Sequence, residues 1–566
     1  NDYSSSGLAS TDVVLDSPTN NFCTLNSIGN DASVTFSEGN LKASVSASTS
    51  ARCEGTFAVS SGKWYWEVNV ISFTTSSTVM IGIKDLTIPG HENDNWNTSS
   101  VYSYYSGNGN KYNSGSSSSY GATYTTGDII GVALDLDTGT LTFYKNGSSQ
   151  GTAYSSLTGE YTLCFGSGLY AWVGVANFGQ DSTFGANETR QNNADDNGIG
   201  DFYYSPPSGY LALCSSNLPD TTISPNQDTQ ATEHMGTAIW SGNDTARKIS
   251  LGFQADWVWT KMRSHTNAHY IFDSSRGDNV SIYSNLTQQE GTGSGRVSFG
   301  DSDGFDLGTD AQTNGSGYTY VGWCWKANGG TTTSDTTGSL TVNRQTSSDA
   351  GFSIITGTTS NVQANDMTET FGHGLGGTPD FIILKPRSVS YGWSVWTSAI
   401  SISDVQGLQL NTTGALFTNS SYRTIQATSS VVQIGRQAVE NNSTTFVCYA
   451  FKEVEGYSKF GTYTGNGNAN GTFVYTGFRP SFLITKNATS SGYNWMMMDS
   501  VRSTFNMVEN SLNPNESNAE SSSDVDIDFL SNGFKLRQSS AWMNQSGSTF
   551  IYMAFAEQPF HLSNAR

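Results

Sequence analysis

Charge is scarce in this chain, and positive charge most of all. Only 13% of the 566 residues are Asp, Glu, Lys or Arg, with 27 basic residues against 48 acidic ones. The formal net charge of −21 repels phosphate backbones and anionic membrane surfaces. No apolar run approaches the ~20 residues that a membrane-spanning helix needs. We therefore expect no nucleic-acid partner and no membrane insertion.

Cysteine is scarce as well, with six residues at positions 23, 53, 164, 214, 324 and 448. No CxxC pair occurs, which excludes the usual zinc-cluster spacings and a small disulfide scaffold. Cys23 and Cys53 could form a disulfide, but buried thiols are favoured, because Cys324 and Cys448 fall in equivalent apolar segments. We predict no metal site and no cofactor.

Convincing helices are missing, and with them the strand-to-helix contexts that phosphate loops and nucleophile elbows need. The sequence instead offers short runs of β-branched and aromatic residues, bounded by Gly, Asn, Ser or Pro. Such runs are typical of strands. We predict an all-β chain of tandem antiparallel β-sandwiches, in roughly four domains.

The second half of the chain contains an internal repeat. Its opening motif, DWVWTK, begins at Asp256 and returns as DFIILK from Asp380 and SFLITK from Ser481. Each copy closes on a second apolar run, and the three runs are Thr319–Trp325, Thr445–Phe451 and Thr549–Phe555. The unit has about one hundred residues, the size of a domain.

The repeat predicts three homologous β-sandwiches, at residues 225–330, 350–455 and 457–560, which we call repeats 1, 2 and 3. We expect them to be independent domains with small interfaces, so that a destabilising substitution in one repeat leaves the other repeats folded. Two sets of aromatic residues should be buried equivalents: Trp257, Phe381 and Phe482, and Trp325, Phe451 and Phe555.

Each opening motif ends in a lysine, namely Lys261, Lys385 and Lys486. The recurrence could mark an anion site. It is also explained by repetition alone, with each side chain lying on the rim of the core and its ammonium in water. We favour the second interpretation.

The first part of the chain carries a different, ordered set of motifs. They are GKWYWEVNV from Gly62, Tyr120-Gly121, GDIIGVALDLD from Gly127, LTFYKNG from Leu141 and VGVANFG from Val173. This order resembles the SPRY family. The resemblance implies a bent, concanavalin-like jelly roll at residues 20–205 that serves binding rather than catalysis. A linker at 206–224 follows it, and an N-terminal segment, 1–19, could continue an upstream domain.

The whole layout resembles virion-associated proteins of tailed marine bacteriophages. The resemblance implies a non-enzymatic virion surface protein, extracellular on the particle, and favours a tail-fibre or receptor-binding component. Its partners would be other virion proteins and a host glycan or outer-membrane protein, and we expect a homo-oligomer. A capsid decoration protein (head fibre) and a secreted bacterial carbohydrate-binding adhesin remain alternatives.

A tyrosine-rich segment, residues 96–124, has the composition of a binding loop, because its tyrosines are set among Ser, Gly and Asn. Tyr112 and Tyr120 match structural positions of the SPRY pattern. We therefore predict that four other aromatics of the segment lie on an exposed loop and bind a receptor or a neighbouring subunit: Trp96, Tyr102, Tyr104 and Tyr105.

Other polar clusters have simpler explanations than chemistry. Asp135/Asp137 and Asp301/Asp303 are carboxylate pairs, but both fall at turns, and a glycosidase needs two acids across a cleft. The cluster from Asp301 to Asp306 could bind calcium, although it lacks the rest of an EF-hand loop. His265 and His269 have no third ligand, which favours solvated loop histidines. We predict no catalytic residue and no enzyme.

Overall fold

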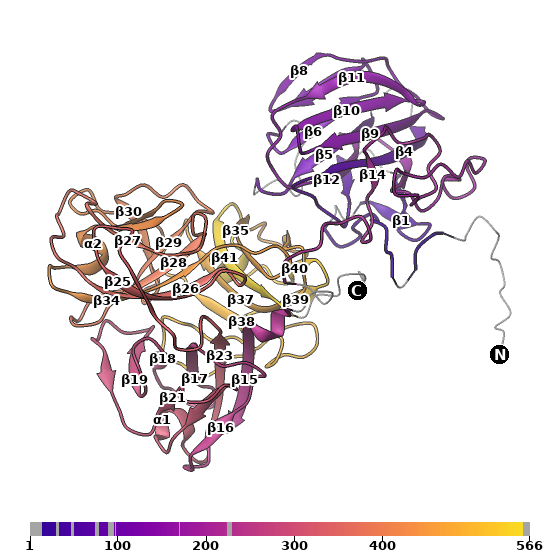
Figure 1. Ribbon diagram of the computed structural model, residues 1–566. Helices are drawn as coiled ribbons and strands as arrows, with labels where there is room; N and C mark the ends of the chain where they lie inside the picture. Colours follow the sequence, from indigo (N-terminus) through magenta and orange to yellow (C-terminus); the bar gives the residue numbers. More distant parts are fainter. Residues whose placement is uncertain are drawn as a thin grey trace, which may run out of the picture. The chain divides into compact units, whose positions relative to one another are not determined.

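The computed structural model describes residues 14–17, 19–29, 33–46, 50–73, 79–88, 96, 98–168, 170–223 and 229–557. Its regular secondary structure is almost wholly antiparallel strand, which confirms the all-β prediction (Figure 1). The chain divides after Pro219 into two compact units. Most of the expected N-terminal segment and the first residues of repeat 1 lie outside the described residues. No helix within the described ranges is long and apolar enough to cross a membrane.

The first unit contains a sandwich of two sheets. The first sheet has the order β1-β2-β13-β4-β9-β10-β11, with β14 beside β4, and the second has the order β3-β12-β5-β6-β7-β8. The strands of the first sheet are β1 (Thr35–Ser37), β2 (Lys42–Val45), β4 (Lys63–Phe73), β9 (Ile129–Asp135), β10 (Thr140–Lys145), β11 (Ser148–Tyr154), β13 (Trp172–Asn177) and β14 (Leu211–Ala212). Those of the second are β3 (Ala51–Glu54), β5 (Val79–Asp85), β6 (Val101–Tyr105), β7 (Asn110–Asn113), β8 (Ser116–Ser119) and β12 (Tyr161–Ser167).

Strand β4 is buried on both faces, which explains why its sequence does not alternate between apolar and polar residues. Trp64 and Trp66 lie in the core between the sheets. Tyr65 points the other way and packs edge-on against Phe202, with ring centroids 5.3 Å apart. The residues after the last SPRY motif therefore cover the outer face of the first sheet and belong to the same unit.

Glu67 holds this covering segment against the first sheet through hydrogen bonds. Its fully buried carboxylate accepts hydrogen bonds from the backbone N–H groups of Tyr203 and Tyr204, each at 2.8 Å, and from the side chain of Asn177 at 3.2 Å. Burial raises the pKa of Glu67 to about 7, because the desolvation of the charge outweighs these hydrogen bonds.

This pKa predicts a pH dependence for the first unit. The raised pKa means that the folded state binds a proton more tightly than the unfolded state does. The contribution to stability is therefore complete below pH 4.5 and is lost as the pH rises through about 7. We expect Glu67 to lower the free energy of unfolding by about 3 kcal/mol over this range. Denaturant titrations from pH 4 to 8 should show this slope in the natural chain and its loss in Glu67→Gln; equal slopes would contradict the prediction.

The second unit contains the three repeats, each a sandwich of a larger sheet and a three-stranded sheet (Figure 1). Repeat 1 has the orders β15-β23-β17-β18-β19-β20 and β16-β22-β21, repeat 2 has β24-β25-β26-β34-β28-β29-β30-β31 and β27-β33-β32, and repeat 3 has β35-β41-β37-β38 and β36-β40-β39.

The strands of repeat 1 are β15 (Met235–Ser241), β16 (Arg247–Ile249), β17 (Trp257–Met262), β18 (His269–Asp273), β19 (Val280–Tyr283), β20 (Gly291–Thr292), β21 (Val297–Ser298), β22 (Phe305–Leu307) and β23 (Thr319–Trp325). Those of repeat 2 are β24 (Thr333–Asp335), β25 (Val342–Ser347), β26 (Phe352–Thr358), β27 (Glu369–Gly372), β28 (Phe381–Pro386), β29 (Ser394–Thr397), β30 (Gln406–Gln409), β31 (Phe417–Thr418), β32 (Ile425–Ala427), β33 (Val431–Ile434) and β34 (Thr445–Phe451). Those of repeat 3 are β35 (Ser458–Thr464), β36 (Phe473–Tyr475), β37 (Pro480–Asn487), β38 (Met496–Asp499), β39 (Ile527–Leu530), β40 (Gly533–Leu536) and β41 (Thr549–Ala556). One short helix precedes each closing strand: α1 (Ala311–Asn314), α2 (Arg436–Val439) and α3 (Ala541–Asn544).

The repeats share one register. The opening motifs form β17, β28 and β37, which pair with the closing strands β23, β34 and β41. The first aromatic residue of each opening motif lies opposite the last of the closing run: Trp257 opposite Trp325, Phe381 opposite Phe451, and Phe482 opposite Phe555. The sheet of repeat 2 begins earlier than residue 350, because β24 and β25 join it through β26.

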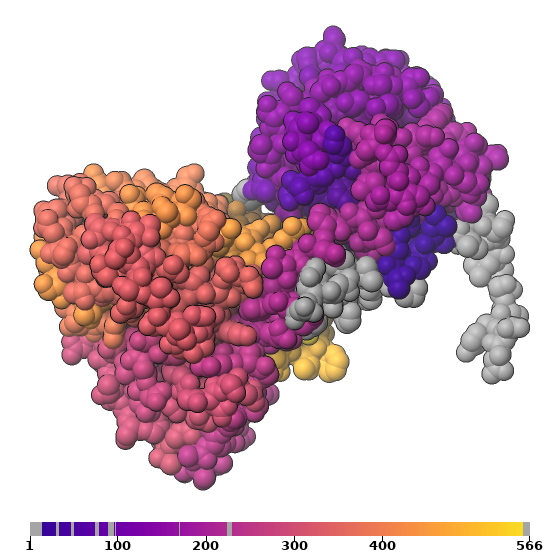
Figure 2. All heavy atoms as spheres, viewed as in Figure 1, coloured from indigo at the N-terminus to yellow at the C-terminus, as the bar shows by residue number. Residues whose placement is uncertain are grey.

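The prediction of independent domains is wrong, because these aromatic pairs meet in one core. Trp257 stacks on Tyr449 of repeat 2 with ring centroids 4.6 Å apart, and Trp325 packs on Phe482 of repeat 3 at 5.4 Å. Phe451 and Phe555 close the ring at 5.9 Å. A single cluster of buried residues runs through all three repeats. Figure 2 shows the surfaces of repeats 1 and 2 meeting along a continuous boundary.

A buried ionic network joins repeat 1 to repeat 2. Arg276 bonds Asp273 at 2.5 Å and Glu290 at 3.3 Å, and both Arg276 and Asp273 are buried. Repeat 2 supplies Arg387, which pairs with Glu290 through two hydrogen bonds, and Tyr449, whose hydroxyl donates to Asp273 at 2.7 Å.

An equivalent ionic network, made of other residues, joins repeat 3 to repeat 1. Arg502 bonds Asp499 at 2.5 Å and Glu520 at 2.9 Å. Repeat 1 supplies Arg263, which pairs with Glu520 through two hydrogen bonds, and Trp323, whose indole N–H donates to Asp499 at 2.9 Å.

Among the described residues, the third interface, between repeats 2 and 3, has no such network. A backbone hydrogen bond from Leu416 to Ala488 corresponds to those from Glu290 to Arg387 and from Glu520 to Arg263. Leu416 and Ala488 thus occupy the places of the paired glutamate and arginine, and both pack against the common core. The chain therefore contains two ionic interfaces and one apolar interface of the same geometry.

The repeated lysines do not keep their ammonium groups in water as we expected. Lys261, Lys385 and Lys486 are almost completely buried. Lys385 donates to the carbonyl of Thr287 in repeat 1 at 3.0 Å, and Lys486 to that of Thr413 in repeat 2 at 3.2 Å. Burial lowers the pKa of Lys385 to about 7 and those of the other two to about 8. The ammonium groups of Lys385 and Lys486 thus link neighbouring repeats.

Candidate functional site

The tyrosine-rich segment forms a strand, β6, rather than an exposed loop. Successive side chains of a strand point to opposite faces, so β6 divides the predicted residues. Tyr104 is completely buried, and its hydroxyl donates to the carbonyl of Ala122. Burial raises its pKa to about 12. Tyr102 is partly buried and packs against Tyr154, with ring centroids 5.2 Å apart.

Trp96 is also buried, with only 3% of its surface exposed. It packs with Val101, Cys164 and Met80 on the outer face of the second sheet. The prediction of an exposed aromatic loop is therefore wrong for Trp96 and Tyr104, because both fill hydrophobic clusters of their own unit.

Tyr105 is the predicted residue that faces outward. It lies opposite Met80 in the register of β5 and β6, and its ring packs against that of Tyr112 at 5.1 Å. All three side chains are partly exposed. We call Met80, Tyr105 and Tyr112 the outer tyrosine patch. Tyr112 matches a structural position of the SPRY pattern, and the hairpin register of β6 and β7 puts it opposite Ser103, on the same face as Tyr105.

Charged residues lie on the same face of this sheet. Glu54 bonds Lys84 at 2.8 Å and Arg52 at 3.2 Å. Arg52 and Met80 both lie opposite Gly166 in the strand register, which places Arg52 two strands away from the outer tyrosine patch, and both Arg52 and Lys84 are buried. The outer tyrosine patch therefore offers apolar and phenolic groups on one sheet, which can bind a ligand or a protein.

The carboxylate pairs hold turns together. Asp135 accepts from the backbone N–H groups of Asp137 and Thr138, and Asp137 accepts from that of Gly62. Asp303 accepts from two backbone N–H groups, while Asp301 pairs with a lysine, Lys248. Across the described ranges, no three His, Cys, Asp or Glu side chains gather as a possible metal site.

The two histidines differ from the expected solvated pair. His265 is exposed in a loop, whereas His269 begins β18 and is completely buried. Its Nδ1 accepts from the indole N–H of Trp259 at 3.0 Å, and its ring stacks on Trp323. Burial lowers the pKa of His269 well below its usual value. All six cysteines are buried thiols, which agrees with the expectation from the sequence.

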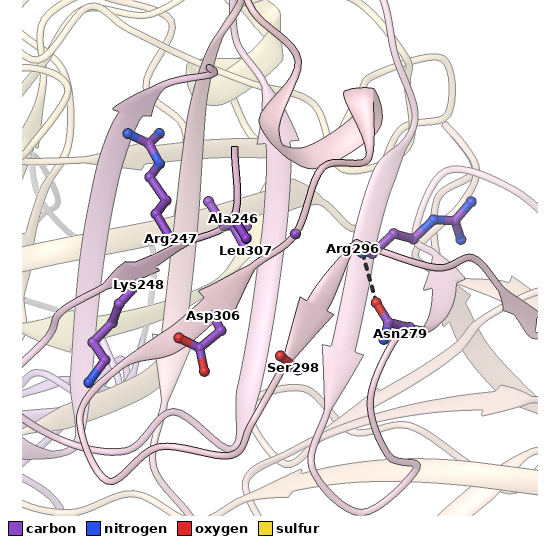
Figure 3. A pocket seen from close by; sticks show the side chains of 10 residues that line it. Ala246, Arg247, Lys248, Asn279, Arg296, Ser298, Asp306 and Leu307 are labelled. Atoms are coloured by element: carbon purple, nitrogen blue, oxygen red, sulfur yellow. Dashed lines mark hydrogen bonds between the residues drawn. The ribbon is translucent and has the colours of Figure 1, made fainter. Parts of the chain in front are cut away.

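A concave site lies on the three-stranded sheet of repeat 1 (Figure 3). Its cavity volume is about 400 Å³. The strand register aligns Lys248, Asp306 and Ser298 across β16, β22 and β21. Arg247 and Arg296 also line the site, and all three cations have partners: Lys248 pairs with Asp301, Arg296 with Asp310, and Arg247 donates to the carbonyl of Ser241.

Comparisons with known proteins agree with the sandwich fold of the first unit. Residues 63–187 match the model of the SPRY domain, so this part of the chain is a SPRY domain. Ran-binding protein 9 of Danio rerio is 33% identical over 120 residues, which are 21% of this chain and 20% of that protein. Ran-binding protein 9 of Homo sapiens is 32% identical over 120 residues, 21% of this chain and 16% of that protein. The chain thus spans about a fifth of the length of the curated relatives it matches.

Two solved structures are similar to the same region. The SPRY domain of human HERC1 is 19% identical, covers 26% of this chain and 96% of its own, and has a TM-score of 0.24. The PSpry domain of TRIM65 is 16% identical, covers 28% of this chain and 89% of its own, and has a TM-score of 0.23.

The larger match lies in the second unit. Residues 230–559, more than half of the chain, match the family described as Domain of unknown function (DUF7483). This range includes all three repeats, in agreement with their common core. The chain therefore belongs to the DUF7483 family and carries a SPRY domain in front of its family domain.

Proposed function

We propose that this chain is a non-enzymatic binding protein that attaches to its partner through the outer tyrosine patch of the SPRY domain. The observation that carries the proposal is the pairing of Tyr105 and Tyr112 on an outer face, where Met80 extends the apolar surface. Partly exposed aromatic residues on a rigid sheet lose little entropy on binding, so they make effective anchors.

The partner at this patch is a protein in our proposal. The patch combines a methionine with two tyrosines, residue types that are enriched at contact surfaces between proteins. The relatives that share the SPRY region have names that state binding to a protein, Ran. A host outer-membrane protein or a neighbouring structural subunit would meet the same requirement.

The specific role that we propose is a surface protein of a bacteriophage virion, in a tail fibre or receptor-binding position. The support is the order of modules in the sequence, a SPRY domain followed by repeated sandwiches, which resembles virion-associated proteins of tailed phages. Gold-labelled antibody against the chain, viewed on particles and cells from the source culture, tests this role. Label on tails is the expected result, label on capsids would indicate a decoration protein, and label on cells alone would refute a virion role.

Loss of the outer tyrosines should weaken attachment without unfolding the domain. For Tyr105→Ser combined with Tyr112→Ser we expect at least tenfold weaker attachment, since buried aromatic anchors contribute about 2 kcal/mol or more each. Adsorption to host cells measures this, and circular dichroism checks the fold. Tyr422→Ser, at an exposed tyrosine of repeat 2, is the control. Unchanged adsorption of a folded double variant would refute the patch as the binding site.

A further inference from the structure

Repeat 1 has an open sheet edge at a place where repeat 2 has a covered one. The closing strand of each repeat pairs with the opening-motif strand on one side and with a second strand on the other. This second strand is β15 in repeat 1, β26 in repeat 2 and β35 in repeat 3. In repeat 2 the antiparallel strand β25 covers the far side of β26, whereas β15 is the last strand of its sheet (Figure 1). Repeat 2 therefore shows how such an edge is occupied.

The backbone of β15 leaves three residues unpaired along this edge. Gly242, which follows β15, donates its N–H to the carbonyl of Tyr318 on the side of β23. Successive residues of a strand direct their N–H and C=O groups to opposite sides, so Met235, Thr237 and Ile239 direct theirs away from β23. Among the described residues, none bonds these six groups. In repeat 2 the equivalent residues of β26 pair with β25.

The sequence of β15 lacks the features that usually protect an edge. Edge strands of soluble proteins are kept from pairing by shortness, charge or proline. In repeat 2 the edge strand β24 has three residues, one of them Asp335. In repeat 3, β35 contains Lys459, and Glu453 accepts the N–H of Phe460 on the open side. Strand β15 has seven residues, MGTAIWS, with neither charge nor proline.

An apolar side chain is exposed on the same edge. Ile239 is 46% exposed, although the next residues in its row of the sheet, Val321 and Lys261, are buried. The equivalent positions of the other two repeats hold threonines, Thr356 and Thr462. The exposed isoleucine thus occurs on the strand whose edge is both open and uncharged.

We propose that β15 of one copy of this chain pairs with β15 of a second copy, antiparallel and across a two-fold axis at Thr237. Thr237 then lies opposite the second copy's Thr237, and Ile239 lies opposite the second copy's Met235. All six outward N–H and C=O groups of each strand gain partners in this register. Opposite side chains of an antiparallel pair share one face, so Ile239 gains an apolar neighbour.

The observations favour a second copy as the occupant. The three outward residues are spaced evenly about Thr237, so the two strands match when one is turned by a half rotation. The pairing brings no charged side chain of β15 against its own copy, which matters for a chain with a net charge of −21. The contact is isologous and closes at a dimer. It does not involve the outer tyrosine patch, so the inference is independent of the proposed function.

A cysteine at the two-fold axis tests the register. Opposite residues of a hydrogen-bonded antiparallel pair have Cα atoms about 5.5 Å apart, which a disulfide can span. Thr237→Cys should therefore give a covalent dimer on mild oxidation of the full chain, seen on non-reducing gels. Ile239→Cys, at the more exposed position, should give none, because position 239 lies about 14 Å from its counterpart along the strands. All six natural cysteines are buried thiols.

Sedimentation velocity of the full chain at rising concentration should show monomers and dimers and nothing larger. Ile239→Lys should weaken dimerisation roughly tenfold or more, because it places an ammonium group in the contact. One control is Thr462→Lys, at the equivalent position of β35. The other is Phe505→Lys, at an apolar side chain that is 83% exposed. Both controls should dimerise as the natural chain does.

A natural chain that stays monomeric at all concentrations would refute the proposal. So would dimerisation that Ile239→Lys leaves unchanged, or that Phe505→Lys abolishes while circular dichroism shows the variant to be folded. Covalent dimers of Ile239→Cys without those of Thr237→Cys would rule out pairing about Thr237.

Discussion

Replacing Trp257 with alanine will destabilise all three repeats together. The side chain is 1% exposed and contacts Trp325 in its own repeat and Tyr449, Phe352 and Phe451 in repeat 2. Truncating a buried tryptophan costs about 3–5 kcal/mol, and here the cavity opens where the repeats meet. Differential scanning calorimetry should therefore show one transition for residues 220–559, shifted as a whole to lower temperature.

The matched control for this prediction is Trp66→Ala, which empties a comparable site in the core of the SPRY domain. It should lower the transition of the first unit and leave that of the three repeats in place, since the chain divides into two units after Pro219. If Trp257→Ala instead separates the transition of repeat 1 from those of repeats 2 and 3, the common core does not fold as one cooperative unit.

The second large effect concerns the ionic network between repeats 3 and 1. For the single variant Arg502→Ile we expect a loss of about 3–5 kcal/mol, because Asp499 would remain buried without its cation. Urea unfolding measures this loss. Isoleucine at position 502 should not lower the free energy of unfolding when the charged partners of Arg502 are also replaced, because the equivalent interface between repeats 2 and 3 is apolar.

The exchange that tests this contrast copies the apolar interface into the ionic one. It combines four substitutions: Arg263→Ala, Asp499→Thr, Arg502→Ile and Glu520→Leu. The new residues are those at the equivalent positions of the apolar interface, namely Ala488, Thr397, Ile400 and Leu416. The hydroxyl of the new threonine can accept the hydrogen bond of Trp323. Because buried ion pairs replaced by packed apolar groups are often neutral or stabilising by about 1–4 kcal/mol, we expect the fourfold variant to be at least as stable as the natural chain. A loss as large as that of Arg502→Ile alone would mean that the network itself stabilises the interface.

The sequence predicted the repeats well because each repeat is marked by short motifs whose strand propensity depends only on neighbouring residues. The motifs that begin at Asp256, Asp380 and Ser481 consist of residues with high strand propensity, and their recurrence requires equivalent positions in one fold. The motif order in the first 187 residues likewise predicted the SPRY domain. The candidate site was less predictable, because composition alone could not tell whether Tyr104 and Tyr105 lie on a loop or on opposite faces of a strand.

The sequence by itself thus determined the strands, their apolar residues, the three repeats and the absence of a recognisable catalytic motif. The tertiary structure alone decided which surfaces the apolar residues cover. A strand such as Trp257–Met262 is apolar on both faces, and one face packs within its own sandwich while the other packs on two neighbouring repeats. Burial on both faces has the same local pattern whether the cover comes from the same domain or from the next one. For this reason the sequence predicted three independent domains where the structure has one shared core. For the same reason it predicted solvated lysines where the structure has buried lysines that link neighbouring repeats.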